Sequence, residues 1–289
     1  MVVRSSAARG GQRMIAGELM ITGEPMLALP HRATDRLTTL TQGAQVLDWR
    51  SGSDQPVIWV SGLSSFEAGV AIRGGIPLCL PWFGGGPSGD LTPKHGTARI
   101  SDWEEIGEHQ YRLAGEPTDQ FPHAWQADFS ATADAATLTL RLTLTNPTEQ
   151  AYAIEELAHT YLAVSDIRQV QVTGLEGVQY ADKAPGAAAA QVVQSGPITF
   201  TGETDRIYAS GGPITLHDPG WDRRLTVETV GASSTVVWNP WVDKAAAMAD
   251  FGDDEWTGMV CLESGNVAGG ALQLEPGASH TLEVRISLA

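Results

Sequence analysis

The sequence predicts an all-β protein, built as an antiparallel sandwich with few short helices. Two stretches carry this prediction, because apolar and polar residues alternate along them: ATLTLRLTLT at residues 136–145 and HTLEVRISL at residues 280–288. An alternation with a period of two places the apolar side chains on one face of a strand and the polar side chains on the other, wet face. No regular alternation of strands with helices is visible, which argues against a parallel doubly wound sheet.

Shorter β-rich runs occur along the rest of the chain, separated by Gly, Pro, Asn and Asp residues at the intervals of a sandwich. They are PVIWVS (56–61), RQVQVTG (168–174), RLTVETV (224–230), STVVWN (234–239) and ALQLEPG (271–277). One helix is expected within VDKAAAMADFG (242–252), where Asp243 would cap the first turn and Gly252 would end about two turns.

The chain is expected to consist of a flexible N-terminal tail, residues 1–20, and a single sandwich domain, residues 21–289. The tail lacks an apolar run long enough for a signal-peptide core, although its Arg- and Ser-containing start also fits a transit peptide. The alanine-rich segment 182–196 has strand-like sequence on both sides, which favours a surface loop over a domain boundary.

Composition limits the partners and the compartment. The 289 residues include 18 Lys and Arg against 34 Asp and Glu, a formal net charge of −16, which repels nucleic-acid phosphates and anionic membranes. An anionic ligand must therefore be small and held locally. The two cysteines, Cys79 and Cys261, lie in apolar runs without metal-type spacing, which indicates buried thiols, a reducing compartment and a cytoplasmic protein.

Two residues have the chemistry of a proton donor and a proton acceptor. His159, in EELAHTYLAV, titrates near neutrality, and Glu263 ends the apolar run GMVCL, where partial desolvation would raise its pKa. Taken alone, His159 fits a structural histidine better, and Glu263 fits a turn-capping carboxylate at least as well, so only the pair points to catalysis. Asp205, in GETDRIY, could orient a histidine, hold a sugar hydroxyl or pair with the adjacent Arg206.

The stretch PKHGTARISDW, residues 93–103, gathers cations in a chain that is otherwise poor in them. Lys94 and Arg99 flank His95 here, and Arg73 lies in another glycine-containing segment. Arg offers a planar fork to phosphate oxygens, and Lys offers a mobile point charge. The three cations could instead balance nearby surface acids, but the clustering of Lys94 and Arg99 with His95 at this net charge favours a small anionic ligand. The sequence pattern does not place Arg73 beside them.

Aromatic residues accompany these segments, and an aromatic face can stack on a sugar ring. They are Trp82, Phe83, Trp103, Trp238 and Trp241, of which the last two are expected in the core or the pocket wall. The sequence GGGP after Phe83 lacks the Lys-Ser/Thr of a P-loop, and neither HExxH nor a zinc-type cysteine pair occurs. We therefore expect no nucleotide site and no bound metal.

Six segments, in order along the chain, are similar to one enzyme family. They are RGGIPLCLPWFG (73–84), KHGTARISDW (94–103), AHTYLAVSDI (158–167), ETDRIY (203–208), VVWNPW (236–241) and FGDDEWTGMVCLESGNV (251–267). From about Gly43 to the C-terminus, the chain resembles the D-hexose-6-phosphate mutarotase branch of the aldose 1-epimerase family. The resemblance implies a galactose-mutarotase-like β-supersandwich that interconverts the α and β anomers of glucose 6-phosphate, or of related hexose 6-phosphates, without a cofactor.

The resemblance also implies a role for each candidate residue. The histidine of AHTYL, His159, would be the acid in its protonated form, and the glutamate of CLESG, Glu263, would be the base. His95 and Asp205 would position the substrate. The cations that bind its phosphate would be Arg73, Lys94 and Arg99.

Three other functions fit the same residues. In a mutarotase of unphosphorylated aldoses the cations would be incidental, and a carbohydrate-binding module would bind a sugar without exchanging its anomers. A metabolite sensor would keep the pocket without turnover. In each case we expect a monomer whose ligand is a small molecule, with no nucleic-acid or membrane partner.

Overall fold

The computed structural model describes residues 20–21, 24–25, 29–187 and 192–289. Apart from Met20, the predicted tail of residues 1–20 lies outside the described residues. The division into this tail and a single domain of residues 21–289 therefore stays a prediction. Among the described helices, none has the length and the apolar character that crossing a bilayer would require.

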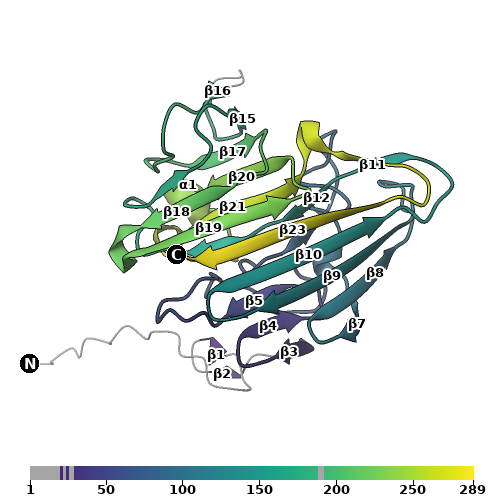
Figure 1. Cartoon of the computed structure of the whole chain (residues 1–289), viewed down its shortest axis with the longest axis horizontal. Coiled ribbons are helices and arrows are strands. Elements are labelled where there is room, and N and C mark those ends of the chain that lie inside the picture. The colour runs from purple at the N-terminus through teal and green to yellow at the C-terminus, as the bar shows by residue number, and fades with distance from the viewer. Residues whose placement is uncertain (1–19, 22–23, 26–28, 188–191) are drawn as a thin grey trace, which may run out of the picture.

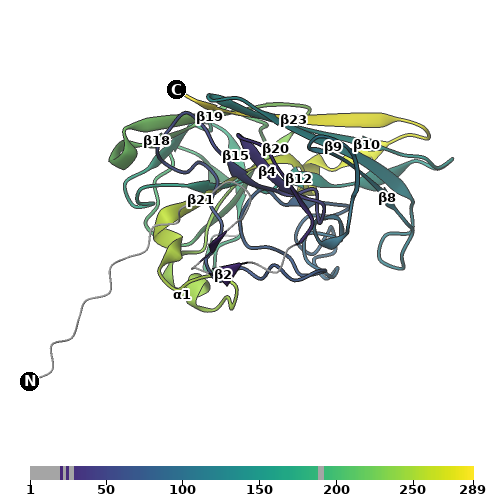
Figure 2. The same ribbon diagram turned by 90° about the horizontal axis from the view of Figure 1, so that it is seen from below.

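Two eight-stranded sheets dominate the fold, and their paired strands run antiparallel, as the sequence predicts (Figure 1). The first sheet contains, in spatial order, β14 (Gln171–Thr173), β18 (Ile214–Asp218), β19 (Arg223–Val230), β23 (Ser279–Leu288), β10 (Thr137–Thr145), β9 (Trp125–Ala133), β8 (Gln110–Gly115) and β7 (Glu104–Gly107). The second contains β16 (Val192–Val193), β15 (Gln179–Asp182), β17 (Thr204–Tyr208), β20 (Ser234–Asn239), β21 (Met259–Asn266), β12 (Glu156–Ala158) and β6 (Leu78–Cys79), with β13 (Tyr161–Ala163) paired to β21. The turned view shows the two sheets as superposed layers (Figure 2).

Smaller elements complete the fold. The short strands are β1 (Met20–Ile21) with β2 (Glu24–Pro25), then β3 (His31–Ala33), β4 (Leu37–Leu40) and β5 (Val46–Trp49), and finally β11 (Tyr152–Ile154) with β22 (Leu272–Leu274). The helices are α1 (Trp241–Ala246) and the 3-10 turns η1 (Ala98–Ile100), η2 (Pro219–Trp221), η3 (Glu255–Gly258) and η4 (Ala268–Gly270). The expectation of few short helices is confirmed for the described residues.

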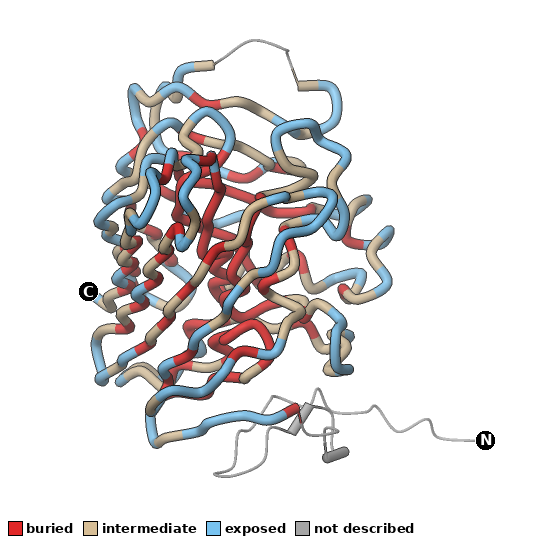
Figure 3. The backbone as a smooth tube through the Cα atoms, turned by 90° about the vertical axis from the view of Figure 1, so that its right-hand side faces the viewer, coloured by how far each residue is buried: buried red, intermediate tan, exposed pale blue. Residues whose placement is uncertain are grey.

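Strand β10 shows why alternating sequence forms this sandwich. Its four leucines are fully or almost fully buried, whereas Arg141 is exposed and pairs with Glu283 of β23 at 3.0 Å. The burial of one face removes apolar side chains from water, and this is the main favourable contribution to folding. Buried residues accordingly concentrate in the interior between the layers, and exposed residues lie on the loops and on the outer faces of strands (Figure 3).

The predicted strand at residues 56–61 is wrong. This segment forms only isolated bridges, between Ile58 and Leu162 and between Val60 and Gly74. Its backbone groups are shared between two different segments of the chain, so no continuous ladder develops. The β-rich composition of the segment gave no indication of this divided pairing.

The helix prediction is right in place and wrong in its cap. Helix α1 begins at Trp241, so Asp243 lies within the first turn instead of capping it. Pro240 occupies the cap position, and the side chain of Asn239 accepts a hydrogen bond from the Trp241 N–H at 2.9 Å. The helix ends at Ala246, well before Gly252.

Candidate active site

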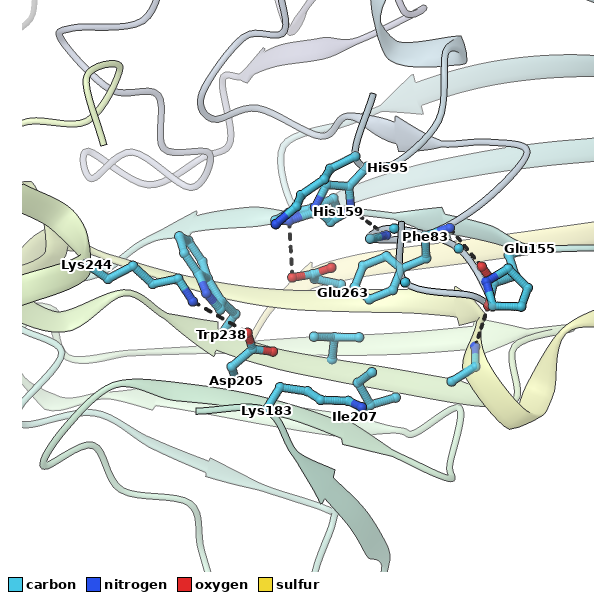
Figure 4. A pocket seen from close by; sticks show the side chains of 18 of the residues that line it. Phe83, His95, Glu155, His159, Lys183, Asp205, Ile207, Trp238, Lys244 and Glu263 are labelled. Carbon is cyan, nitrogen blue, oxygen red and sulfur yellow. Dashed lines mark hydrogen bonds and ion pairs between the residues drawn. The ribbon is translucent and has the colours of Figure 1, made fainter. Parts of the chain in front are cut away.

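One cavity collects most of the candidate residues. It has a volume of about 660 Å³ and lies over β17, β20 and β21 of the second sheet (Figure 4). Asp205 and Ile207 reach it from β17, Val236 and Trp238 from β20, and Glu263 from β21. Residues two positions apart on a strand share a face, so the strand register alone assembles this wall.

The glycine-rich loop from Phe83 to His95 forms another part of the wall. Its end is fixed by Gly96, which has a φ of +73° and whose added Cβ would lie only 1.8 Å from the carbonyl oxygen of Leu80. Only glycine fits such a contact at such a φ. The close approach brings His95 to the end of β6, beside the cavity.

His159 and Glu263 face each other across the cavity wall. Strands β12 and β13 both pair with β21, and the register on either side of His159 places it opposite Glu263. The His159 Nε2 and Glu263 Oε1 atoms are 3.4 Å apart, and the two side chains are only 8% and 1% exposed. Both line the same cavity, so an imidazole and a carboxyl group meet at one site.

The surroundings push the pKa values of this pair in opposite directions. Burial lowers the pKa of His159 well below its ordinary value, and the neighbouring His95, Arg99 and Arg73 lower it further. Burial raises the pKa of Glu263 well above its ordinary value, and the nearby Asp205 adds to this. Both directions favour the uncharged forms, a neutral imidazole and a carboxylic acid. The resemblance implies the charged forms for the reacting pair, so both shifts act against them.

His95 lies beside this pair as a neutral hydrogen-bonding group. Its ring meets the His159 ring edge to face, with centroids 5.4 Å apart. Burial, followed by the charges of Arg99, Arg73 and Lys94, lowers the pKa of His95 to about 3. Its Nδ1 atom is 3.3 Å from the Gly84 N–H, which donates to it, so the ring proton must be on Nε2.

The three predicted phosphate cations do not occupy equivalent positions. Arg73 and Lys94 line the cavity, and Arg73 is held by Asp250 at 3.1 Å and by the hydroxyl of Tyr161 at 3.1 Å. Arg99 is not among the lining residues. Its guanidinium donates a hydrogen bond to the Lys94 carbonyl oxygen at 2.7 Å, and its charge still lowers the pKa of His95. Arg99 therefore supports the Lys94 backbone and acts on the site through its field.

Asp205 lines the cavity, but its cationic neighbour is not the one considered from the sequence. Arg206 pairs with Asp182 at 3.4 Å, whereas Asp205 lies 3.6 Å from the ammonium group of Lys244. Successive residues of a strand point to opposite faces, so Asp205 and Arg206 cannot share a site. Burial raises the pKa of Asp205, and Lys244 opposes that effect.

Three polar residues of the cavity were not predicted from the sequence. Lys244 comes from α1 and also pairs with Glu203 at 2.6 Å. Lys183 follows β15, in the segment interpreted only as a loop. Glu155 precedes β12, and its carboxylate accepts hydrogen bonds from the Phe83 N–H and the Ala268 N–H at 2.9 and 2.7 Å. Of these three residues, only Glu155 could have been found from the sequence, because it lies within the run EELAHTYLAV that contains His159.

One further group of side chains has the donor atoms of a metal site. One ligand atom each of His159, Cys261 and Glu263 lies within 4.8 Å of the other two, and all three residues are buried. Both cysteines of the chain are free and buried, as expected from their apolar neighbours.

The comparison with known proteins assigns most of the chain to one family. The family model described as Aldose 1-epimerase matches residues 26–287. A protein of Cenchrus ciliaris is 33% identical over 264 residues, covering 85% of this chain and 79% of its own length. A protein of Escherichia coli (strain K12) is 33% identical over 234 residues, covering 77% of each chain. Both relatives carry the name "Putative glucose-6-phosphate 1-epimerase".

Solved structures match along most of the chain as well. The crystal structure of a "putative mutarotase (YeaD)" from Salmonella typhimurium superposes with a TM-score of 0.76 at 27% identity, covering 90% of this chain and 92% of the other. A galactose mutarotase-like protein from Lactobacillus casei ATCC 334 superposes with a TM-score of 0.68 at 14% identity, covering 91% and 100%. The predicted galactose-mutarotase-like β-supersandwich is thereby confirmed.

Proposed function

Because the chain belongs to the aldose 1-epimerase family, we propose that it interconverts the α and β anomers of hexose 6-phosphates, with glucose 6-phosphate as the preferred substrate. The observation that carries the proposal is the contact between His159 Nε2 and Glu263 Oε1, 3.4 Å apart, in a cavity that Arg73 and Lys94 also line. The cavity thus combines an acid and base pair with cations for a remote phosphate.

The reaction needs two proton transfers and no change in oxidation state. Glu263 as carboxylate takes the proton of the anomeric hydroxyl, the bond between C1 and the ring oxygen breaks, and protonated His159 gives its proton to that oxygen. Rotation about the C1–C2 bond turns the aldehyde, and the reverse transfers close the ring on its other face. Each positioned proton transfer contributes roughly a hundred- to ten-thousand-fold in rate, so two side chains suffice without a cofactor.

The phosphate has a second role in this scheme, beyond binding. The neutral pair that burial favours and the ionised pair that starts the reaction differ only in the position of one proton, which moves from Glu263 to His159. A dianionic phosphate beside Arg73 and Lys94 offsets the positive charges that lower the pKa of His159. Substrate binding therefore favours the protonated imidazole that the ring oxygen needs.

The other polar residues position the sugar. His95 presents an Nε2–H donor next to His159, and Asp205 presents an acceptor from β17 on the same cavity. Such contacts hold the anomeric carbon near the reacting pair, and holding it there removes part of the entropic barrier. Trp238 forms an apolar part of the same wall and packs edge to face on His159 at 6.3 Å.

Magnetisation-transfer NMR on equilibrated glucose 6-phosphate tests the proposal directly, because exchange between the two anomeric signals needs no coupling enzyme. We expect the protein to accelerate exchange strongly on glucose 6-phosphate and much less on glucose, with Glu263→Gln as the matched inactive control. Equal acceleration on both sugars would favour a mutarotase of unphosphorylated aldoses. Binding without exchange would leave a carbohydrate-binding protein.

A further inference from the structure

We propose that His159, Cys261 and Glu263 form a binding site for a thiophilic divalent metal ion such as Zn²⁺, and that occupation of this site switches the protein off. The metal-binding half stands on the geometry alone. The inhibition half rests on the proposed function, because it assumes that His159 and Glu263 transfer the protons.

The geometry of the three side chains suits a tetrahedral ion. Cys261 and Glu263 are two positions apart on β21, so their side chains share a face, and one ligand atom of each lies within 4.8 Å of one from His159. Two donors about 2.1 Å from zinc at the tetrahedral angle lie about 3.4 Å apart. The His159 Nε2 and Glu263 Oε1 atoms are already 3.4 Å apart, so only the thiol has to approach.

Unsatisfied polar atoms at this place give an independent reason to expect a ligand. Glu263 Oε2 and His159 Nδ1 are buried and have no hydrogen-bond partner among the described residues. Buried polar atoms are normally paired, and exceptions ask for an explanation such as an ion. A metal ion bound at this place would give the buried Glu263 carboxylate a partner.

The chemistry of the donor set selects the class of metal. A thiolate, an imidazole and a carboxylate together are ligands of zinc and of softer divalent ions, not of Mg²⁺ or Ca²⁺. On binding, the thiol and the carboxyl group each release a proton to solvent as the metal–sulfur and metal–oxygen bonds form, and the imidazole donates its lone pair. The charges of thiolate and carboxylate cancel that of the ion, as a buried site requires.

The metal would inhibit the reaction because it would occupy the lone pairs that accept protons from the sugar. His159 and Glu263 line the cavity, so the fourth position of the ion would open toward it and take water. With the imidazole nitrogen and the carboxylate both coordinated, neither can exchange a proton with a sugar. Cys261 is not among the lining residues, so its replacement leaves the proposed acid and base in place.

Titration with Co²⁺, which replaces zinc and absorbs light, tests the binding half. We expect a thiolate-to-cobalt charge-transfer band and tetrahedral visible bands in the wild-type protein and in Cys79→Ala, which removes the other buried thiol. The charge-transfer band should be missing in Cys261→Ala, and in Cys261→Ser if the alanine variant does not fold. Lack of the band in the wild-type protein, or its persistence without Cys261, would overturn the site.

Zinc binding and inhibition are then measured on the same three proteins. Competition with a chromophoric chelator should show at least about tenfold weaker zinc binding in Cys261→Ala, since even outer partners of metal ligands are worth that much. Zinc should suppress anomer exchange in the wild type and in Cys79→Ala. In Cys261→Ala the same zinc concentration should leave the metal-free exchange rate unchanged. Stimulation by zinc would refute the inhibition. Lack of exchange in the metal-free protein would refute the proposed function alone, because the cobalt spectra still decide the site.

Discussion

Arg73 donates a hydrogen bond from Nη1 to the hydroxyl oxygen of Tyr161, 3.1 Å away, and the ring of Tyr161 stacks on that of His159 with centroids 4.7 Å apart. The proposed phosphate ligand and the proposed acid are therefore joined by one buried side chain that is not among the cavity-lining residues. Tyr161 therefore fixes the position of Arg73 relative to His159.

Tyr161→Phe separates these two functions, because it keeps the stacked ring and removes the hydroxyl. Arg73 keeps its pairing with Asp250, so we expect a loss of about 1 kcal/mol, which is about a fivefold higher KM for glucose 6-phosphate. The kcat value should stay within about twofold of wild type. Anomer exchange on glucose serves as the control. An equal effect on both sugars would mean that Tyr161 acts on the reacting pair instead.

Glu263→Gln and His159→Asn test the proton transfers with side chains of similar size. Each should lower kcat by roughly a hundred- to ten-thousand-fold, because each removes one general acid or base while the cavity keeps its shape. Anomer exchange on saturating glucose 6-phosphate gives kcat, and a thermal melt checks that the variants fold. Near-normal kcat in a folded Glu263→Gln protein would refute the assignment of the base.

Lys94→Met and Arg99→Met distinguish a phosphate ligand from its support. Lys94 lines the cavity and is exposed, so its loss should raise KM for glucose 6-phosphate about fivefold, as expected for one charge-assisted contact. Arg99 acts through the Lys94 backbone and through its field, so its loss should cost less in KM. Lys183→Met is the matched control, a second lysine on the same cavity with no proposed phosphate contact. A larger effect from Arg99 than from Lys94 would reverse the two roles.

The strands that the sequence predicts best are those whose pairing is continuous. Residues 136–145 and 280–288 pair with each other over nine positions, so the alternation of each strand reports one uninterrupted environment. The segment 56–61 has the same kind of composition but divides its backbone between Leu162 and Gly74. Pairing of that kind is decided by distant segments, which a local pattern does not contain.

The candidate site likewise contains residues that the sequence predicts and residues that it does not. His159, Glu263, His95, Asp205, Arg73 and Lys94 all line one cavity, although they come from separate parts of the chain. Their chemistry was visible in the sequence because short motifs surround them. Lys183 and Lys244 have no such motif, and only the register of β15 and β17 and the start of α1 bring them to the cavity. The contact of Asp205 with Lys244 was not predicted for the same reason.

Sulfate should raise the pKa of His159, because a dianion beside Arg73 and Lys94 offsets the charges that lower it. The ring signals of His159 in NMR should titrate at a lower pH than those of an ordinary histidine, because burial lowers the pKa of His159. With saturating sulfate they should begin to shift at a higher pH. His217, on β18 outside the cavity, is the internal reference. An unchanged His159 titration in bound sulfate would contradict the second role of the phosphate.

Stability should depend on pH through the pair of Glu156 and the half-buried His280, neither of which lines the cavity. The Glu156 carboxylate is fully buried, accepts a hydrogen bond from Asn266 at 2.9 Å, and lies 3.1 Å from His280 Nε2. The hydrogen bond to Glu156 is the main cause that raises the pKa of His280 above its ordinary value. A raised pKa means that the folded protein binds the proton more tightly, so this stabilisation is complete below the unfolded pKa and is lost as pH rises through the folded one.

Glu156→Gln removes the charge and keeps the shape and the hydrogen bonding to Asn266. The stabilisation from the pair is about 1 kcal/mol, so the wild-type protein should lose a few degrees more of its Tm than the variant between about pH 6 and about pH 9. His280→Gln should reduce the pH dependence of Tm by the same amount as Glu156→Gln, since it removes the other partner of the pair. Thermal melts of the three proteins at both pH values provide the measurement. Identical slopes in all three would show that His280 titrates without any linkage to folding.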